Sequence, residues 1–206
     1  MRKELTIEYY NKHTQEFVDR TVNADMSFCQ EKFLRMLSSG AMILDAGCGS
    51  GRDSKFFLEK GMRVQAIDAS ERMCRMAAHY IGQTVDCLQF DEVDYVEKFD
   101  GIWACASLLH VEKKELPDIL RKFHRALKLE GILYASFKFG EAEEERLERF
   151  FSDYHLEEVE RVFLQDGLFE LVESFETADV RADYKDKPWV NILVRKKQVQ
   201  SSDKKN

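Results

Sequence analysis

Three glycines at alternate positions, Gly47, Gly49 and Gly51, follow a short apolar segment that begins at Ile43. Because glycine has no Cβ and tolerates positive φ, such a turn lets the backbone pass very close to a ligand. A second apolar segment, Arg63–Asp68, ends on an acidic residue. In open α/β sheets, nucleotide-like ligands bind at the carboxyl ends of strands arranged in this way. The turn therefore favours an α/β fold and predicts a cofactor site.

Apolar segments of strand length alternate with amphipathic helical segments between residues 42 and 137, which predicts a parallel sheet covered on both faces. The predicted strands of this part are Met42–Asp45, Arg63–Asp68, Thr84–Gln89, Phe99–Ala106 and Gly131–Phe137. Two later strands, Phe169–Phe175 and Pro188–Arg195, are joined by a short link, which favours an antiparallel hairpin at the sheet edge. The predicted fold class is α/β, a doubly wound, seven-stranded mixed sheet.

Helical patterns flank this sheet. A single amphipathic helix is predicted over Leu5–Arg20, and Ser27 begins a capping box for a second helix. Asp53 and Ser54 are predicted to cap the helix after the glycine turn, and Ser70 to cap the next one. Further helices are predicted over residues 116–127, Glu143–Phe151 and Leu156–Gln165.

The chain of 206 residues fits one domain, which we predict over residues 1–198. Its predicted parts are an N-terminal helical cap (1–40), a cofactor-binding core (41–138), a helical lid (139–166) and edge strands (167–196), followed by a flexible tail (197–206). No segment has the length and apolarity of a membrane span or a signal peptide, so we expect no membrane association.

The net charge of −7 disfavours nucleic acid as the main partner, because phosphate binding requires a basic surface.

The five cysteines include no C-x-x-C pair and have no nearby histidine at metal-ligand spacing. We therefore expect reduced thiols, a cytoplasmic location and no metal site. The oligomeric state cannot be read from the sequence.

The glycine turn departs from the dinucleotide motif G-x-G-x-x-G, because the sixth position counted from Gly47 is Arg52. The chain reads D-x-G-x-G-x-G from Asp45 onward, which disfavours a nicotinamide-dependent reductase. Asp68 is placed to accept hydrogen bonds from ribose hydroxyls, and Asp91 from an adenine amino group. Phe90 and Met73 offer apolar faces to the base, and Arg52 with the Gly47–Gly49 backbone can hold an amino-acid tail. These groups suit S-adenosylmethionine, which carries no phosphate.

Four segments in the correct order resemble class I S-adenosylmethionine-dependent methyltransferases: residues 43–51, 66–70, 99–107 and 127–133. The run Gly49–Ser54 is similar to small bacterial tellurite-resistance-type methyltransferases. The resemblance implies that Ala69 and Met73 line the adenosine, that the loop Ala106–His110 faces cofactor and acceptor, and that an N-terminal helix roofs the pocket. The cofactor-binding residues predicted from the motifs and the resemblance together are Tyr10, Thr21, Asp45, Gly47, Cys48, Gly49, Arg52, Asp68, Ala69, Met73, Phe90, Asp91 and Ala106.

The predicted function is in-line transfer of the sulfonium methyl group to a small-molecule acceptor. His110 is either a general base or a hydrogen-bonding residue at a helix start, and Lys138 either binds an anionic acceptor or points to water. No N-P-P-Y-type element follows the fourth strand, where Ala104–Ser107 stands instead, and this disfavours methylation of a planar base amine. A cofactor-binding module without turnover and an RNA methyltransferase remain alternatives. The acceptor itself cannot be read from the sequence.

Overall fold

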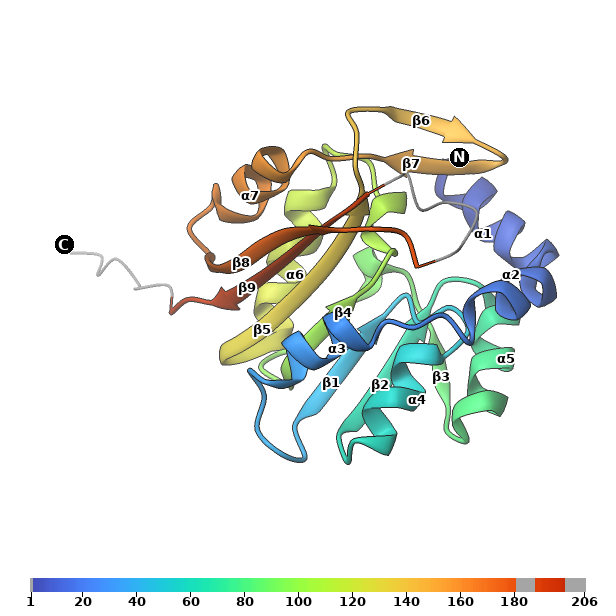
Figure 1. Ribbon diagram of the computed structural model, residues 1–206, viewed down its shortest axis with the longest axis horizontal. Coiled ribbons are helices and arrows are strands. Elements are labelled where there is room, and N and C mark those ends of the chain that lie inside the picture. The colour runs from blue at the N-terminus through green and yellow to red at the C-terminus, as the bar shows by residue number, and fades with distance from the viewer. Residues whose placement is uncertain (1, 181–187, 199–206) are drawn as a thin grey trace.

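A seven-stranded mixed sheet forms the centre of the structure, a computed structural model that describes residues 2–180 and 188–198 (Figure 1). Its strands are β1 (Met42–Ala46), β2 (Arg63–Asp68), β3 (Val85–Cys87), β4 (Phe99–Ala104), β5 (Leu127–Lys138), β8 (Phe169–Thr177) and β9 (Trp189–Lys196). They lie in the order β3-β2-β1-β4-β5-β9-β8, with β9 antiparallel to both neighbours and the first five strands parallel. The predicted doubly wound sheet with its antiparallel edge hairpin is confirmed.

Helices pack on both faces of this sheet. The helices of the described residues are α1 (Arg2–Lys12), α2 (Thr14–Thr21), α3 (Ser27–Leu34), α4 (Arg52–Glu59), α5 (Glu71–Ile81), α6 (Leu116–Ala126) and α7 (Leu156–Leu164), with 3-10 turns at Phe90–Glu92 and Leu108–His110. Phe33 of α3 and Phe57 of α4 pack with Ile43 on one face. Phe123 of α6 and Phe163 of α7 pack with residues that include Leu44 on the other. Successive residues of β1 therefore face opposite layers, as the two-residue period of a strand requires.

The core explains why the central strands read as continuous apolar runs. Ile43, Leu44 and Ala46 of β1 have no exposed surface, because a parallel strand between two helical layers is buried on both sides. Burial of each large aliphatic side chain contributes about 1.5–3 kcal/mol to folding. Trp103 of β4 stacks on Tyr134 of β5, with ring centroids 3.9 Å apart and planes 12° from parallel. This stack fixes the two strands beside the functional site described below.

Two predictions about the N-terminal helices are wrong. The single helix over Leu5–Arg20 is two helices, α1 and α2, which meet at His13. Ser27 is the first residue of α3 rather than its cap: its N–H donates to the Asp25 carboxylate at 2.9 Å.

The glycine turn ends differently from the prediction as well. Gly51, at φ 80°, is the residue before α4, and Asp53 and Ser54 lie inside the first turn of the helix. They do not cap it, because both side chains are committed to buried hydrogen bonds beneath the glycine turn. Ser70, by contrast, caps α5 as predicted, and its hydroxyl accepts a hydrogen bond from the Met73 N–H.

The helix predicted over Glu143–Phe151 is a β-hairpin, made of β6 (Glu143–Arg146) and β7 (Arg149–Ser152). Its two turn residues, Leu147 and Glu148, both have positive φ, as in the tightest hairpin turns. The hairpin is anchored from outside its own sequence. The Phe150 N–H donates to Thr6 Oγ1 of α1 at 3.0 Å, and Ser152 Oγ donates to the Val111 carbonyl at 2.8 Å. These distant contacts override the helical pattern of the local sequence.

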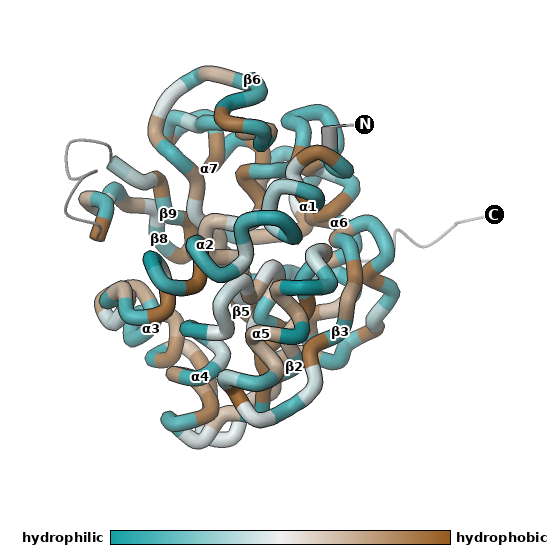
Figure 2. Tube along the Cα trace, turned by 90° about the vertical axis from the view of Figure 1, so that its right-hand side faces the viewer, coloured by the Kyte–Doolittle hydropathy of each residue, from teal (hydrophilic) through white to brown (hydrophobic). Residues whose placement is uncertain are grey.

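Most of the remaining predicted elements fall close to their expected bounds. The third strand is shorter than predicted, since β3 covers only Val85–Cys87, and the fifth begins earlier, since β5 starts at Leu127, directly after α6. The predicted tail lies outside the described residues from position 199 onward, and so do residues 181–187 of the link between β8 and β9. Figure 2, a view turned by 90° from that of Figure 1, also shows α1 beside the β6–β7 hairpin. None of the helices in the described ranges is long and apolar enough to cross a lipid bilayer.

Candidate active site

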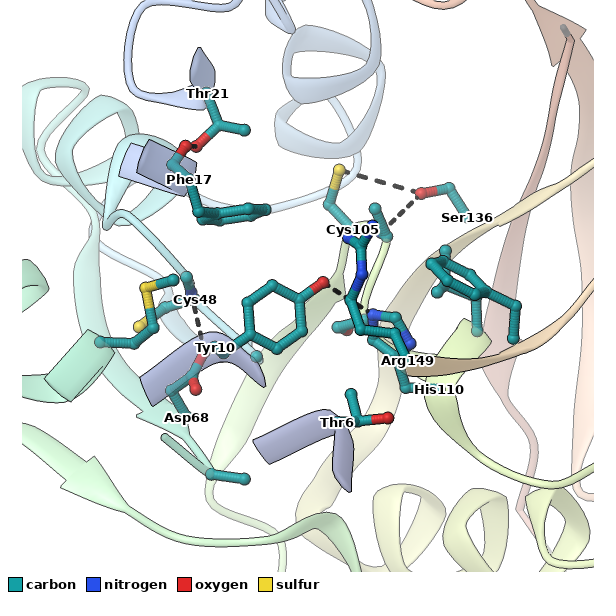
Figure 3. Close-up of a pocket in the computed structure, with 18 of the residues that line it drawn as sticks. Thr6, Tyr10, Phe17, Thr21, Cys48, Asp68, Cys105, His110, Ser136 and Arg149 are labelled. Carbon is teal, nitrogen blue, oxygen red and sulfur yellow. Dashed lines mark hydrogen bonds between the residues drawn. The ribbon is translucent and has the colours of Figure 1, made fainter. Parts of the chain in front are cut away.

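A cavity of about 970 Å³ opens at the carboxyl ends of the parallel strands. Its floor comes from the glycine turn after β1, the end of β2, and the segments that follow β4 and β5. Its cover comes from α1, α2 and the β6–β7 hairpin (Figures 1 and 3). The strand order reverses between β1 and β4, so the cavity lies at the topological switch point where α/β sheets bind ligands.

Two glycines of the turn lie very close to neighbouring side chains. Gly47, at φ 81°, is so close to the loop after β4 that an added Cβ would lie 2.5 Å from the Ser107 Cβ. Gly49, at φ 52°, faces α2, where an added Cβ would lie 3.2 Å from the Phe17 ring. Both positions line the cavity. The turn therefore needs glycine for its positive φ and for the close passage of backbone past the cavity.

Asp68 at the end of β2 ties this turn to the second strand. Its Oδ2 accepts from the Gly49 N–H and its Oδ1 from the Ser70 N–H, each at 2.9 Å. A carboxylate offers about four acceptor positions, so two remain for hydroxyl groups of a ligand. Burial raises the pKa of Asp68, although the backbone N–H groups oppose that shift.

Under the turn lies a buried polar cluster around Asp53. Arg52 donates to both carboxylate oxygens of Asp53 at 2.8 Å, while Trp103 Nε1 and Gln30 Nε2 donate at 2.9 and 2.6 Å. Burial opposes ionisation of Asp53, but the Arg52 charge and these donors hold its pKa below the usual value. Asp45 accepts from Ser54 Oγ at 2.6 Å; burial, with the Asp53 charge beside it, raises the Asp45 pKa to about 7.

At the other end of the cavity, Asp91 accepts a hydrogen bond from Lys3 Nζ of α1 at 2.9 Å. This hydrogen bond holds the pKa of Asp91 below its usual value. Phe90 and the fully buried Met73 line the same region with apolar surface. Lys3 thus fastens the first helix over the predicted adenine subsite.

The loop after β4 carries backbone strain beside the cavity. Ala106 has φ 52°, a conformation that residues with a Cβ rarely adopt. It is held there because its N–H donates to Ser136 Oγ at 2.8 Å and because the adjacent Ser107 Oγ donates to the Ala46 carbonyl at 2.6 Å. The loop is therefore fixed against both β1 and β5 where it faces the cavity.

Tyr10 and His110 form a hydrogen-bonded pair at the cavity wall (Figure 3). His110 Nδ1 lies 2.6 Å from the Phe150 carbonyl, which only accepts, so Nδ1 carries the proton and Nε2 is the acceptor. The Tyr10 hydroxyl, 2.9 Å from Nε2, is then the donor. Burial lowers the pKa of His110 to about 3, so the ring is neutral. His110 is hydrogen-bonded at the end of the 3-10 turn Leu108–His110 and also lines the cavity, and its role as a general base stays a prediction.

The structure brings together nearly all of the predicted site residues. Asp45 does not line the cavity and lies beneath it, where it supports the turn through Ser54. Those that do line it are Tyr10, Thr21, Gly47, Cys48, Gly49, Arg52, Asp68, Ala69, Met73, Phe90, Asp91, Ala106 and His110. Within the described ranges, no group of histidine, cysteine or acidic residues is arranged to hold a metal.

Among the lining residues that sequence reasoning missed are Phe17, Arg20 and Arg149. Phe17 lies one heptad after Tyr10, so the helical period carried a signal for it. Arg20 lies on the same helix as Phe17, α2, and also lines the cavity. Arg149 carried no such signal, because its segment was predicted as a helix and its position depends on the hairpin turn.

Sequence comparison agrees with the fold. The profile of the family described as "Methyltransferase domain" matches residues 43–131, which contain the glycine turn and β1 to β4. The YqeM protein of Bacillus subtilis, named only as a candidate methyltransferase, is 35% identical over 111 residues, which are 48% of this chain and 44% of that protein. The malonyl-[acyl-carrier protein] O-methyltransferase of Salmonella typhimurium is 30% identical over 99 residues, 45% of this chain and 37% of that one. The match thus spans less than half of these curated relatives.

Solved structures match over most of the chain. The 1,6-didemethyltoxoflavin-N1-methyltransferase of Burkholderia thailandensis, crystallised with its substrate and S-adenosylhomocysteine, has a TM-score of 0.77 at 23% identity and covers 93% of this chain and 85% of its own. The [4+2]-cyclase SpnF has a TM-score of 0.73 at 17% identity, covering 92% and 94%. These likenesses establish the fold.

The predicted class, that of the class I S-adenosylmethionine-dependent methyltransferases, is confirmed by the family match and the fold. Residues 43–131 match the family described as "Methyltransferase domain". The finer resemblance to tellurite-resistance-type enzymes stays a prediction.

Proposed function

We propose that this protein transfers a methyl group from S-adenosylmethionine to a small-molecule acceptor inside the cavity. The observation that carries the proposal is the cradle made by Gly47, Gly49 and Asp68. An added Cβ would clash with Ser107 at Gly47 and crowd the Phe17 ring at Gly49, and the Asp68 carboxylate keeps acceptor capacity after binding two backbone N–H groups. This suits a ribose whose neighbouring group carries no phosphate better than a pyrophosphate, which would be repelled by the carboxylate.

The other subsites fit the same cofactor. Asp68 would accept from the ribose hydroxyls, Asp91 from the adenine amino group, and Met73 and Phe90 would contact the ring. The S-adenosylmethionine-binding relative described above, with S-adenosylhomocysteine in its crystals, supports this choice. When bound, S-adenosylmethionine supplies an activated methyl group on a sulfonium.

In such a reaction the protein contributes mainly alignment and exclusion of water. The strained loop at Ala106 and Ser107 would set the floor of the transfer site, and α1 with the β6–β7 hairpin would close it. The Tyr10 hydroxyl is the polar group that His110 orients at this place. Because His110 Nε2 already accepts from Tyr10, a proton leaving the acceptor would pass through the tyrosine hydroxyl to reach the imidazole.

The test is calorimetric titration of the protein with S-adenosylhomocysteine, followed by transfer of labelled methyl from S-adenosylmethionine to pooled small molecules. We expect Asp68→Ala to weaken S-adenosylhomocysteine binding at least about tenfold, because it removes acceptors for two hydroxyl groups. Asp86→Asn is the matched control, since Asp86 is an exposed carboxylate of the neighbouring β3 and does not line the cavity. Equal affinities for the two variants would contradict the proposal.

A binding module without turnover is the second candidate. The fold alone does not decide against it, because a structure of the same fold is named as a cyclase and not as a methyltransferase. Cofactor binding with no labelled product would support it. RNA methylation would instead give RNA binding that weakens steeply with added salt, which the charge of −7 disfavours.

The proposal extends to the domain organisation and the cellular location. We propose that residues 1–198 act as one domain whose cover is made by residues 1–40 and 139–166. We also propose a cytoplasmic location, supported by five cysteines that are all unpaired thiols.

A further inference from the structure

Three cationic side chains surround one phenyl ring in the cavity wall formed by β5 and the β6–β7 hairpin. Lys138 Nζ and the Arg146 guanidinium carbon each lie 4.6 Å from the centroid of the Phe151 ring, and that of Arg149 lies 5.1 Å away. All four residues line the cavity. Like charges gathered in a partly enclosed site repel one another and raise the local positive potential. In a chain of net charge −7, such a cluster calls for an anionic partner.

The cations of this cluster differ in how far the protein neutralises them. Arg146 is paired with Asp153 at 2.6 Å and lies 3.5 Å from Glu144. Arg149 forms no ion pair with any carboxylate in residues 2–180 and 188–198, and its Nε, like that of Arg146, is buried without a hydrogen-bond acceptor. Burial of an unpaired guanidinium N–H is unfavourable unless a ligand supplies the acceptor. Arg149 is therefore the group of the cluster whose charge the fold leaves unmatched.

Arg149 is also placed beside the proposed transfer site. Its guanidinium carbon lies 4.4 Å from the Tyr9 ring centroid and 5.9 Å from that of Tyr10. In Figure 3 it lies next to Tyr10 and His110 within the pocket. A guanidinium carries five N–H donors in its plane, so Arg149, which also hydrogen-bonds the Tyr10 hydroxyl, has donors left that match a carboxylate or phosphate.

We propose that the methyl acceptor is an oxyanion, a molecule with a carboxylate or phosphate group, and that Arg149 binds this group with support from Lys138 and Arg146. This rests on the proposed function, because it assigns the acceptor side of the same cavity. The rings of Tyr9 and Phe151 would hold the body of the molecule, and Tyr10 would face its nucleophilic atom.

The experiment uses the full chain saturated with S-adenosylhomocysteine and measures the binding of three probes by calorimetry. Benzoate and phenyl phosphate distinguish the two sources of the oxyanion, and benzamide is the neutral match of benzoate. We expect benzoate or phenyl phosphate to bind at least ten times more tightly than benzamide. Arg149→Gln should remove that preference, and Arg149→Lys should restore part of it.

The matched control is Arg75→Gln, an arginine of α5 that pairs with Glu71 and does not line this cavity. It should leave all three affinities unchanged. Thermal unfolding of each variant tests whether the hairpin still folds, and Arg146→Gln, which loses the pair with Asp153, gives a second variant of the same hairpin. For Arg146→Gln we expect a smaller loss of the anion preference, about threefold.

Three results would overturn the inference. The first is equal binding of benzoate, phenyl phosphate and benzamide, or no binding of any of them, to the saturated wild-type protein. The second is an unchanged preference in a folded Arg149→Gln protein. The third is a loss of S-adenosylhomocysteine affinity in that variant, which would assign Arg149 to the carboxylate of the cofactor tail. All three leave the proposed cofactor in place, whereas wild-type protein that does not bind S-adenosylhomocysteine contradicts the proposed function itself.

Discussion

The two halves of the cavity are built in different ways. The cofactor half comes from backbone turns at the ends of adjacent strands, and its main contacts, such as Gly49 to Asp68, join residues 19 positions apart. The acceptor half is assembled from distant segments: Tyr10 meets His110 at a separation of 100 residues, and Thr6 meets Phe150 at 144. The first half is part of the sheet itself, while the second depends on a helix and a hairpin that pack over it. One fold can thus keep its cofactor site while its cover changes.

The largest effect should come from a substitution that fills the cofactor half. Gly47→Ala places a Cβ 2.5 Å from Ser107, so we expect S-adenosylhomocysteine affinity to fall at least about 100-fold. Gly40→Ala is the matched control, since Gly40 also has positive φ, 72°, but an added Cβ meets nothing within 4 Å. It should cost only about 1 kcal/mol of stability. Similar affinities of the two variants in calorimetry would show that the close approach at Gly47 is not needed.

A substitution in the acceptor half should separate turnover from cofactor binding. Tyr10→Phe removes the hydroxyl that donates to His110 but keeps the ring. We expect the rate of methyl transfer to fall about tenfold, as for the loss of one hydrogen bond at the transfer site, while S-adenosylhomocysteine affinity changes less than about threefold. Steady-state kinetics and calorimetry measure the two quantities. A parallel loss of both would place the hydroxyl in the cofactor half instead.

The pH dependence of stability should report His110. Burial lowers its folded-state pKa to about 3 from 6.5, so between these values the unfolded chain binds a proton that the folded protein does not. The free energy of unfolding therefore falls as pH decreases through this window, by at most about 1.4 kcal/mol per pH unit. His110→Gln removes this contribution, so the difference between wild type and variant in urea unfolding should shrink from pH 6.5 downward. A constant difference would mean that His110 is protonated in the folded state.

The smallest effect is expected at the ion pair between Lys3 of α1 and Asp91, beside the predicted adenine subsite. Lys3 and Asp91 are 37% and 50% exposed in their side chains, so their ion pair contributes at most about 1 kcal/mol. Lys3→Met should change the free energy of unfolding by no more than this amount, and the change should disappear in high salt. A larger loss that persists at high salt would show that α1 is held mainly by this contact.

The cofactor half could be predicted from the sequence because its signals are local. The apolar runs of β1 and β2 and the positive-φ glycines act through the backbone nearest to them, so Gly47, Gly49 and Asp68 lie together at the cavity as expected, and their binding of the cofactor stays a prediction. Asp45 was misplaced because its motif position does not reveal that its side chain turns downward to Ser54.

The acceptor half could not be predicted in the same way. The acidic run Glu143–Glu145 resembles a helix start, but the turn at Leu147 and Glu148 and the contact from Thr6 produce a hairpin. The position of Arg149 follows from that turn, and a one-residue shift would move it to the other side of the strand. Tertiary contacts over more than a hundred residues carry no periodic signal in the sequence.

The place of β9 in the sheet has a consequence for how the protein is made. This strand lies between β5 and β8, although both are synthesised before it. Until Trp189–Lys196 leaves the ribosome, β5 has an unpaired edge and β8 has no neighbour to join. Nascent chains stalled short of this segment should accordingly bind chaperones or aggregate, because the last strand of the sheet to be synthesised is an interior one.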